Sequence, residues 1–102
     1  MQIQINFGDM SNSDAIENHI HDTLHHELRH TGDRVTRVEV HLRDDKQKRS
    51  GPDDVRCTME ARIAGEQPLA VDDKGRDMYK VISSTADKLA SAVNRKIGKR
   101  EG

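Results

Sequence analysis

The spacing of apolar residues alternates along this chain between every second position and about every fourth, and this change most limits the folds it can adopt. Residues 2–7, 35–43 and 55–64 alternate apolar and polar side chains, as strands with one buried face do. Residues 11–28 and 76–97 instead repeat apolar residues at helical spacing. We therefore expect three strands and two amphipathic helices from this pattern alone.

The later helical segment is the longest periodic stretch, with a stripe formed by Met78, Ile82, Ala86, Leu89, Val93 and Ile97. The earlier one has a narrower stripe formed by Ile16, Ile20, Leu24 and Leu28. Ser11, Asn12 or Ser13 is available as its N-cap, and Gly32 is suited to a left-handed residue that terminates it.

A short fourth strand is expected around residues 69–71, and the preceding Pro68 places it at a sheet edge or at the start of a strand. Residues 44–54 contain no apolar side chain and should form a solvated loop. The order is then β-α-β-β-β-α. This predicts one α+β domain over residues 1–102, with a four-stranded, mostly antiparallel sheet, two helices packed on one face, and a layout like that of double-stranded-RNA-binding domains.

The composition limits the cellular compartments and the kinds of partner to be expected. The single cysteine, Cys57, cannot form an internal disulfide and lies in an alternating segment, so we expect a small buried side chain in a reducing compartment. No apolar run reaches the length of a signal peptide or a membrane span, which predicts a soluble cytoplasmic protein without membrane contact. The aromatic residues are Phe7 and Tyr79 alone.

The segment HELRH (His26–His30) matches the H-E-x-x-H pattern of zinc proteases. A catalytic zinc needs a third protein ligand and a cleft, and neither is evident. Five histidines lie within residues 19–30, so a chance match is expected, and His30 adjoins the helix end. We predict a solvated helix face, with no catalytic residues, no metal site and no cofactor. Adventitious metal binding stays open, and stoichiometric zinc lost in His26→Ala with His30→Ala would reveal it.

Positive charge is concentrated at the C-terminal end of the chain. Residues 76–102 hold seven basic and three acidic residues, although the whole chain has a net charge of −1. The basic residues from position 80 onward are Lys80, Lys88, Arg95, Lys96, Lys99 and Arg100. Such an array attracts phosphates through counterion release. It is equally expected of a solvated helix whose C-terminal dipole favours cations.

The outward residues of the second and third strands are Arg37, Glu39, His41, Arg56, Thr58, Glu60 and Arg62. Sheets that read RNA stack bases on exposed aromatic side chains, which this face lacks. Mixed charges there favour cross-strand salt pairs instead.

The run DMYKVISSTADKL (residues 77–89) resembles the Asp-Met-Tyr…Ile…Asp-Lys-Leu run of the ribosome hibernation-promoting factor and ribosome-associated inhibitor family, also called sigma-54 modulation protein or S30EA ribosomal protein. MQIQI, SDAI and GDRVTRVEVHL are similar to its first strand, first-helix opening and second-strand junction. Residues 51–71 look like a branch with a longer second hairpin. By this resemblance we expect the short form, which lacks the C-terminal dimerising domain of long members.

The resemblance implies a stress or stationary-phase factor that binds 16S rRNA in the mRNA and tRNA channel of the small ribosomal subunit, with no small-molecule substrate. It places RNA contacts at Arg34, Lys88, Arg95 and Lys99, to which the charge pattern adds Lys80, Lys96 and Arg100. It also implies that Asp77 caps the last helix, that Met78 is core and that Tyr79 is structural.

The first helix departs from the family, because Thr23, His25 and His26 stand where lysines are frequent. Histidine ordinarily gains a proton between pH 8 and pH 5, so His25 and His26 are candidates for a pH-dependent RNA contact. A regulatory protein-interaction module using the sheet face or the acidic hairpin (Asp44, Asp45, Asp53 and Asp54) is the alternative function. Charge reversal at Lys88, Arg95 and Lys99 would separate the two, since it should abolish only ribosome binding.

Overall fold

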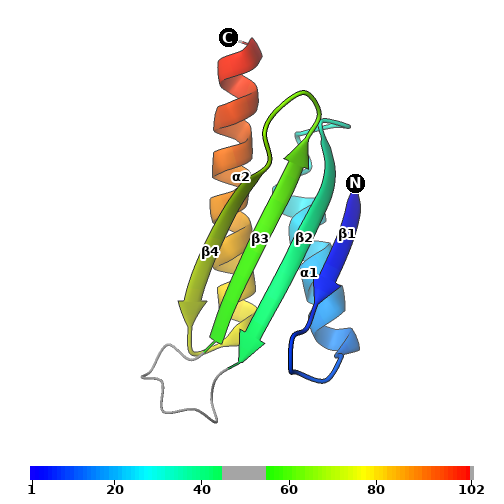
Figure 1. Ribbon diagram of the computed structural model, residues 1–102, viewed down its shortest axis with the longest axis vertical. Coiled ribbons are helices and arrows are strands. Elements are labelled where there is room, and N and C mark those ends of the chain that lie inside the picture. Colours follow the sequence, from blue (N-terminus) through cyan, green and yellow to red (C-terminus); the bar gives the residue numbers. More distant parts are fainter. Residues whose placement is uncertain (45–54, 102) are drawn as a thin grey trace.

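The four strands form one sheet, and both helices cover the same face of it in the computed structural model (Figure 1). Residues 1–44 and 55–101 are described, with side chains up to residue 98. The order is β1 (Gln2–Asn6), α1 (Asp14–Glu27), β2 (Val35–Asp44), β3 (Val55–Ile63), β4 (Leu69–Gly75) and α2 (Met78–Glu101). The predicted 44–54 loop lies outside the described residues beyond Asp44, which ends β2.

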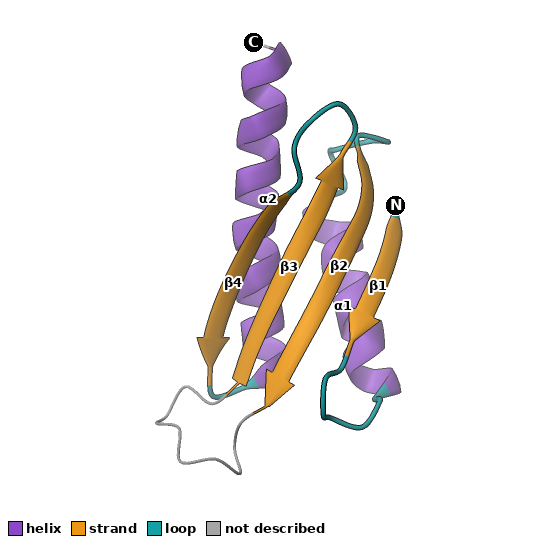
Figure 2. Cartoon of the chain, in the orientation of Figure 1, coloured by secondary structure: helices purple, strands orange, loops and turns teal. Residues whose placement is uncertain are grey.

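The sheet has the strand order β1-β2-β3-β4, and Figure 2 shows its open face in front of the two helices. β1 pairs with β2 in parallel, whereas β2–β3 and β3–β4 are antiparallel. The parallel pair requires a crossover, which α1 supplies. The predicted α+β fold, mostly antiparallel with two helices on one face, is therefore confirmed.

Both helices begin at side-chain caps. Ser13 is the N-cap of α1, and its Oγ accepts from the backbone N–H of Ile16 at 3.2 Å. Asp77 Oδ1 accepts from the N–H of Tyr79 at 2.9 Å and from that of Lys80 at 3.3 Å, which confirms the predicted cap. These carboxylate and hydroxyl oxygens satisfy amide groups that a helix start leaves without partners.

The end of α1 lies earlier than a glycine terminator at Gly32 suggests. The helix stops at Glu27, and Gly32 adopts its positive φ of 58° in the following turn. Two side chains satisfy the last carbonyls instead. Arg29 Nη1 donates to the carbonyl of His26 at 2.7 Å, and Thr31 Oγ1 donates to that of Leu28 at 2.8 Å.

β4 is longer than its apolar residues predict. The predicted strand covered residues 69–71, but pairing continues through Asp72, Asp73 and Lys74 to Gly75. Hydrogen bonding to β3 extends this strand regardless of its polarity. β4 follows Pro68 directly and lies at the sheet edge, as predicted.

The core lies between the sheet and the helices. Its largest fully buried side chains include Ile20, Leu24, Met59, Ile82, Leu89 and five valines. Met78 is also in the core with 9% exposure, as predicted, whereas Tyr79 is 44% exposed. Neither helix, within the residues described, has an apolar stretch long enough to cross a membrane.

Cys57 is fully buried on β3, as predicted. Burial raises the pKa of its thiol to about 12, against a smaller opposing effect of the hydrogen bond with Thr85. Because the thiolate is the reactive form, we expect native protein to resist thiol reagents at pH 8 while unfolded protein reacts fully. Labelling with a chromogenic disulfide reagent, with and without 6 M guanidinium, would measure this. Fast stoichiometric labelling of the native protein would contradict the burial.

Candidate nucleic-acid interface

The C-terminal turns of α2 carry four of the predicted RNA contacts at one end of the molecule, and the side chains of two of them are described. These turns rise past the β3–β4 turn in Figure 1. Arg95 is exposed and Lys96 is half-buried. Both lie in the C-terminal part of α2, before its last turn. Lys99 and Arg100 belong to the same helix, but their side chains lie outside the described residues.

Arg34 lies at the same end of the molecule as these turns. It immediately precedes β2, and its carbonyl accepts from the N–H of Ala64 in the β3–β4 turn at 2.8 Å. Its side chain is half-buried and already has an interaction partner. The fold thus places Arg34 at the same end as Arg95 and Lys96, although some 60 residues separate them in the sequence.

Lys88 has a structural contact that the sequence did not predict. Its Nζ lies 3.5 Å from Asp73 Oδ1 and donates to the carbonyl of Asp72 at 3.3 Å. Ser84 Oγ donates to Asp73 Oδ2. This hydroxyl lowers the pKa of Asp73, helped by the N–H of Lys74 and by the Lys88 ammonium. Lys88 therefore attaches α2 to the edge strand β4, and half of its side chain stays exposed.

Lys80 lies near the start of α2, at the opposite end from Arg95. Fifteen residues of helix separate the two positions, which amounts to about 22 Å. Lys80 is exposed, and its predicted RNA contact does not share a surface with the C-terminal turns.

The histidine-rich helix α1 packs beside α2. His19 Nε2 donates to the carbonyl of Tyr79 at 3.1 Å and lies 3.1 Å from Ser83 Oγ. The rings of His19 and Tyr79 meet edge to face at 5.1 Å. His25 and His26 lie exposed in the last turn of α1, and Arg29 Nη1 is 3.3 Å from His26 Nε2.

The HELRH segment does not have the geometry of a zinc site. The pattern requires both histidines on one helix face, but α1 ends at Glu27 and His30 lies beyond it. In the described part of the chain, no group of three or more histidine, cysteine, aspartate or glutamate side chains is placed to hold a metal.

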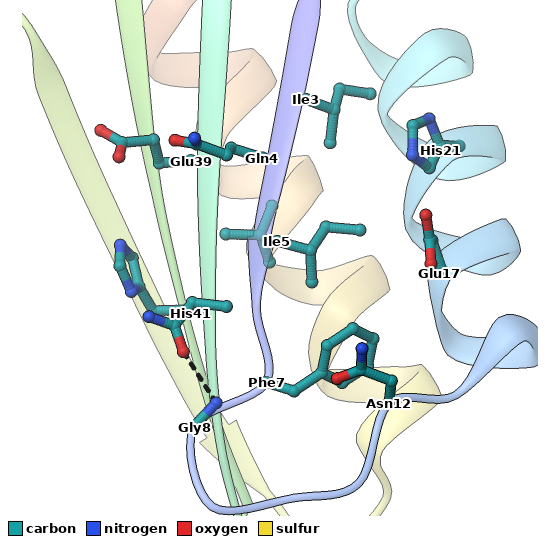
Figure 3. Close-up of a pocket in the computed structure, with 12 residues that line it drawn as sticks. Ile3, Gln4, Ile5, Phe7, Gly8, Asn12, Glu17, His21, Glu39 and His41 are labelled. Atoms are coloured by element: carbon teal, nitrogen blue, oxygen red, sulfur yellow. Dashed lines mark hydrogen bonds between the residues drawn. The ribbon is translucent and has the colours of Figure 1, made fainter.

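Several polar side chains line a hollow beside the end of β1, but they form two separate groups (Figure 3). Gln4, Glu39 and His41 lie on one side of the strand, and Glu17 and His21 approach from α1 on the other. Ile3 and Ile5 come between the two groups. These polar groups therefore do not converge on one point, as acid–base chemistry requires.

The strand register corrects the prediction of cross-strand salt pairs on the open sheet face. Directly opposite residues carry like charges: Arg37 faces Arg62, Glu39 faces Glu60, and Arg43 faces Arg56. An ion pair on this face runs along β2 instead, from Arg37 Nη2 to Glu39 Oε1 at 3.3 Å. Sequence reasoning missed Arg43 and Lys74 as functional candidates, because only the register places them in one row with Arg56.

Comparison with known proteins identifies the family. The family described as Sigma 54 modulation protein / S30EA ribosomal protein matches residues 3–101. The chain belongs to this family. No curated protein matches it. Membership in the S30EA family confirms the predicted resemblance, which covers nearly the whole chain.

Two solved structures share the fold of this S30EA family member. A ribosomal subunit interface protein from Coxiella burnetii aligns with a TM-score of 0.80 and 17% identity, over 96% of this chain and 99% of that one. The N-terminal domain of Protein Y from Thermus thermophilus aligns with a TM-score of 0.75 and 21% identity, over 93% and 98%. Both likenesses concern the arrangement of the elements.

Proposed function

We propose that this protein binds 16S rRNA in the mRNA and tRNA channel of the small ribosomal subunit and so inhibits translation during stress or stationary phase. The observation that supports it most is membership of the S30EA family over residues 3–101. The similar fold of the ribosomal subunit interface protein from Coxiella burnetii agrees with this proposal.

The proposed mechanism requires a positively charged surface and a domain large enough to occupy the channel, and it requires no catalysed reaction. Arg34, Arg95 and Lys96 gather at one end of the molecule, where guanidinium and ammonium groups can neutralise phosphates. A rigid domain held in the channel would exclude mRNA and tRNA sterically. Steric inhibition of this kind requires no cofactor and no catalytic residue.

Co-sedimentation of the protein with purified 30S subunits across a salt series tests the proposal. Three phosphate contacts predict a fall in the association constant of roughly 30-fold between 50 and 200 mM salt. In vitro translation should decline in proportion to the fraction of subunits bound. No co-sedimentation at 50 mM salt would refute the proposal and leave the protein-interaction module, suggested by the sigma-54 name, as the function to test.

Acidification should strengthen binding if the last turn of α1 also contacts rRNA. Histidine ordinarily gains positive charge as pH falls from 8 to 6, and His25 and His26 are both exposed. We expect the affinity for 30S subunits at matched ionic strength to be several-fold higher at pH 6 than at pH 8. The variant His25→Gln with His26→Gln should lose this difference. Equal affinities of the unaltered protein at the two pH values would exclude the contact.

A further inference from the structure

The charges on the open face of the sheet are arranged in rows across the strands. The row of Arg37 and Arg62 is positive, and the next row, Glu39 and Glu60, is negative. These two rows lie two residues apart along each strand, so their charges balance. His41 and Thr58 follow, with Asp72 opposite Thr58 on β4.

The last row is positive and, among the described residues, has no adjacent row of equal negative charge. Arg43, Arg56 and Lys74 lie opposite one another on three adjacent strands, and all three are exposed. Arg43, its member on β2, already has an interaction partner. Asp72 supplies a single negative charge in the neighbouring row. Within the described residues, the side chains of Arg56 and Lys74 form no hydrogen bond or ion pair. Like charges directly opposite one another destabilise a sheet, so folding alone does not favour this row.

The form of the row fits a chain of phosphates. Neighbouring strands lie about 4.8 Å apart, so the three cations extend along a line of about 10 Å across the sheet. A hollow adjoins the row, and His41, Arg43, Arg56 and Thr58 line it together with Asp9 and Asp44. Arginine binds phosphate oxygens through two parallel N–H groups, which suits an extended phosphodiester backbone.

A protein partner fits this face less well. Stable protein interfaces need a buried apolar centre, and the described outward residues of the sheet are polar or charged except for Ala70. The exposed large hydrophobic residues in the described part are Met1 and Tyr79, and neither belongs to a strand. Aromatic side chains for base stacking are absent from this described face as well, so recognition here would be independent of base sequence.

We propose that Arg43, Arg56 and Lys74 form a second binding surface for the phosphodiester backbone of RNA, on the face of the sheet opposite the helices. It deepens the proposed ribosomal function, on which its biological role rests. Arg95 and Lys96 lie on the helical side at the other end of the molecule. Because the two surfaces lie on opposite faces and at opposite ends of the molecule, the domain would join two separate RNA segments.

The test counts RNA strands bound per protein. A 6-nucleotide single-stranded RNA, too short to run between two surfaces at opposite ends of a molecule 46 Å long, is titrated into the full chain at 50 mM salt. The stoichiometry is read by native mass spectrometry with fluorescence anisotropy. We expect two strands on the unaltered protein and one strand on Arg56→Glu with Lys74→Glu. One strand on the unaltered protein, or no change in this variant, would overturn the sheet surface.

A matched control lies on the same strand and the same face. Arg62→Glu changes the net charge by the same amount as Arg56→Glu, six residues and about 20 Å away, but in a balanced row. Arg56→Glu should lower the affinity for the second RNA strand about tenfold or more, while Arg62→Glu should change this affinity by less than threefold. Equal effects of the two variants would show that RNA binding depends on net charge and not on this row. Circular dichroism melts verify that both variants fold.

Two further results separate this inference from the proposed function. If RNA binding depends on Arg56 and Lys74 but the protein does not co-sediment with 30S subunits, the ribosomal function is refuted and the RNA-binding surface on the sheet stands. The double variant Arg56→Glu with Lys74→Glu could instead bind 30S subunits unchanged, while the unaltered protein binds one RNA strand. That result would refute the sheet surface and leave the ribosomal function standing. Binding to phosphatidylserine vesicles but not to RNA would replace the nucleic acid by a membrane and overturn the inference.

Discussion

Replacing Arg95 and Lys96 by glutamate should lower the affinity for 30S subunits about 100-fold at 100 mM salt. Each charge-assisted contact with phosphate is worth about a factor of ten, and reversal adds repulsion. The dependence of affinity on salt should also become shallower, by roughly 0.7 to 0.9 in the log–log slope for each lost phosphate. Co-sedimentation across a salt series measures both quantities.

The choice of these two positions follows from the contacts of Lys88. Reversing Lys88 would place a carboxylate beside Asp73 and replace the ion pair between α2 and β4 by repulsion, so a loss of binding could reflect a local change of structure. Arg95 is exposed near the end of α2, where substitution leaves the core intact. Arg95→Glu alone should be compared with Arg62→Glu, which has the same charge change on the sheet. Equal losses in these two variants would show that net charge, and no particular surface, governs binding.

Replacing Leu89 by alanine should destabilise the fold by about 2–5 kcal/mol. Leu89 is fully buried where α2 packs on the sheet, so truncation leaves a cavity that the surrounding side chains fill only in part. Domains of this size have about 5–15 kcal/mol of stability in total, and each kcal/mol shifts Tm by about 4–8 °C. Urea unfolding and a thermal melt would therefore show a large change.

A neighbouring surface position provides the control for this prediction. Ser91 is exposed on the same helix, and Ser91→Ala should change the stability by about 0.5 kcal/mol or less. If Leu89→Ala lowered the free energy of unfolding no more than Ser91→Ala does, the placement of α2 against the sheet would be wrong. Because Leu89 does not reach the surface, any 30S binding that survives in Leu89→Ala should keep its salt dependence.

Local patterns in the sequence determined the elements and their buried faces. Alternation assigned Val38, Val40 and Met59 to the core because successive strand residues point to opposite faces. The stripe through Ile82 and Leu89 placed α2 correctly for the corresponding reason in a helix. Asp77 was predictable as a cap because capping depends only on residues two or three positions away.

Tertiary structure decided where the charges meet. The sequence placed Arg56 on an outer face, but its position in one row with Arg43 and Lys74 depends on the register of three strands. The same pairing carried β4 through polar residues that an apolar pattern excludes, and it left Lys88 beside Asp73. Register is fixed by contacts between residues distant in sequence, so no local spacing contains it. The candidate surfaces of this protein therefore depend on the assembled sheet, whereas its helices and strands can be predicted from neighbouring residues.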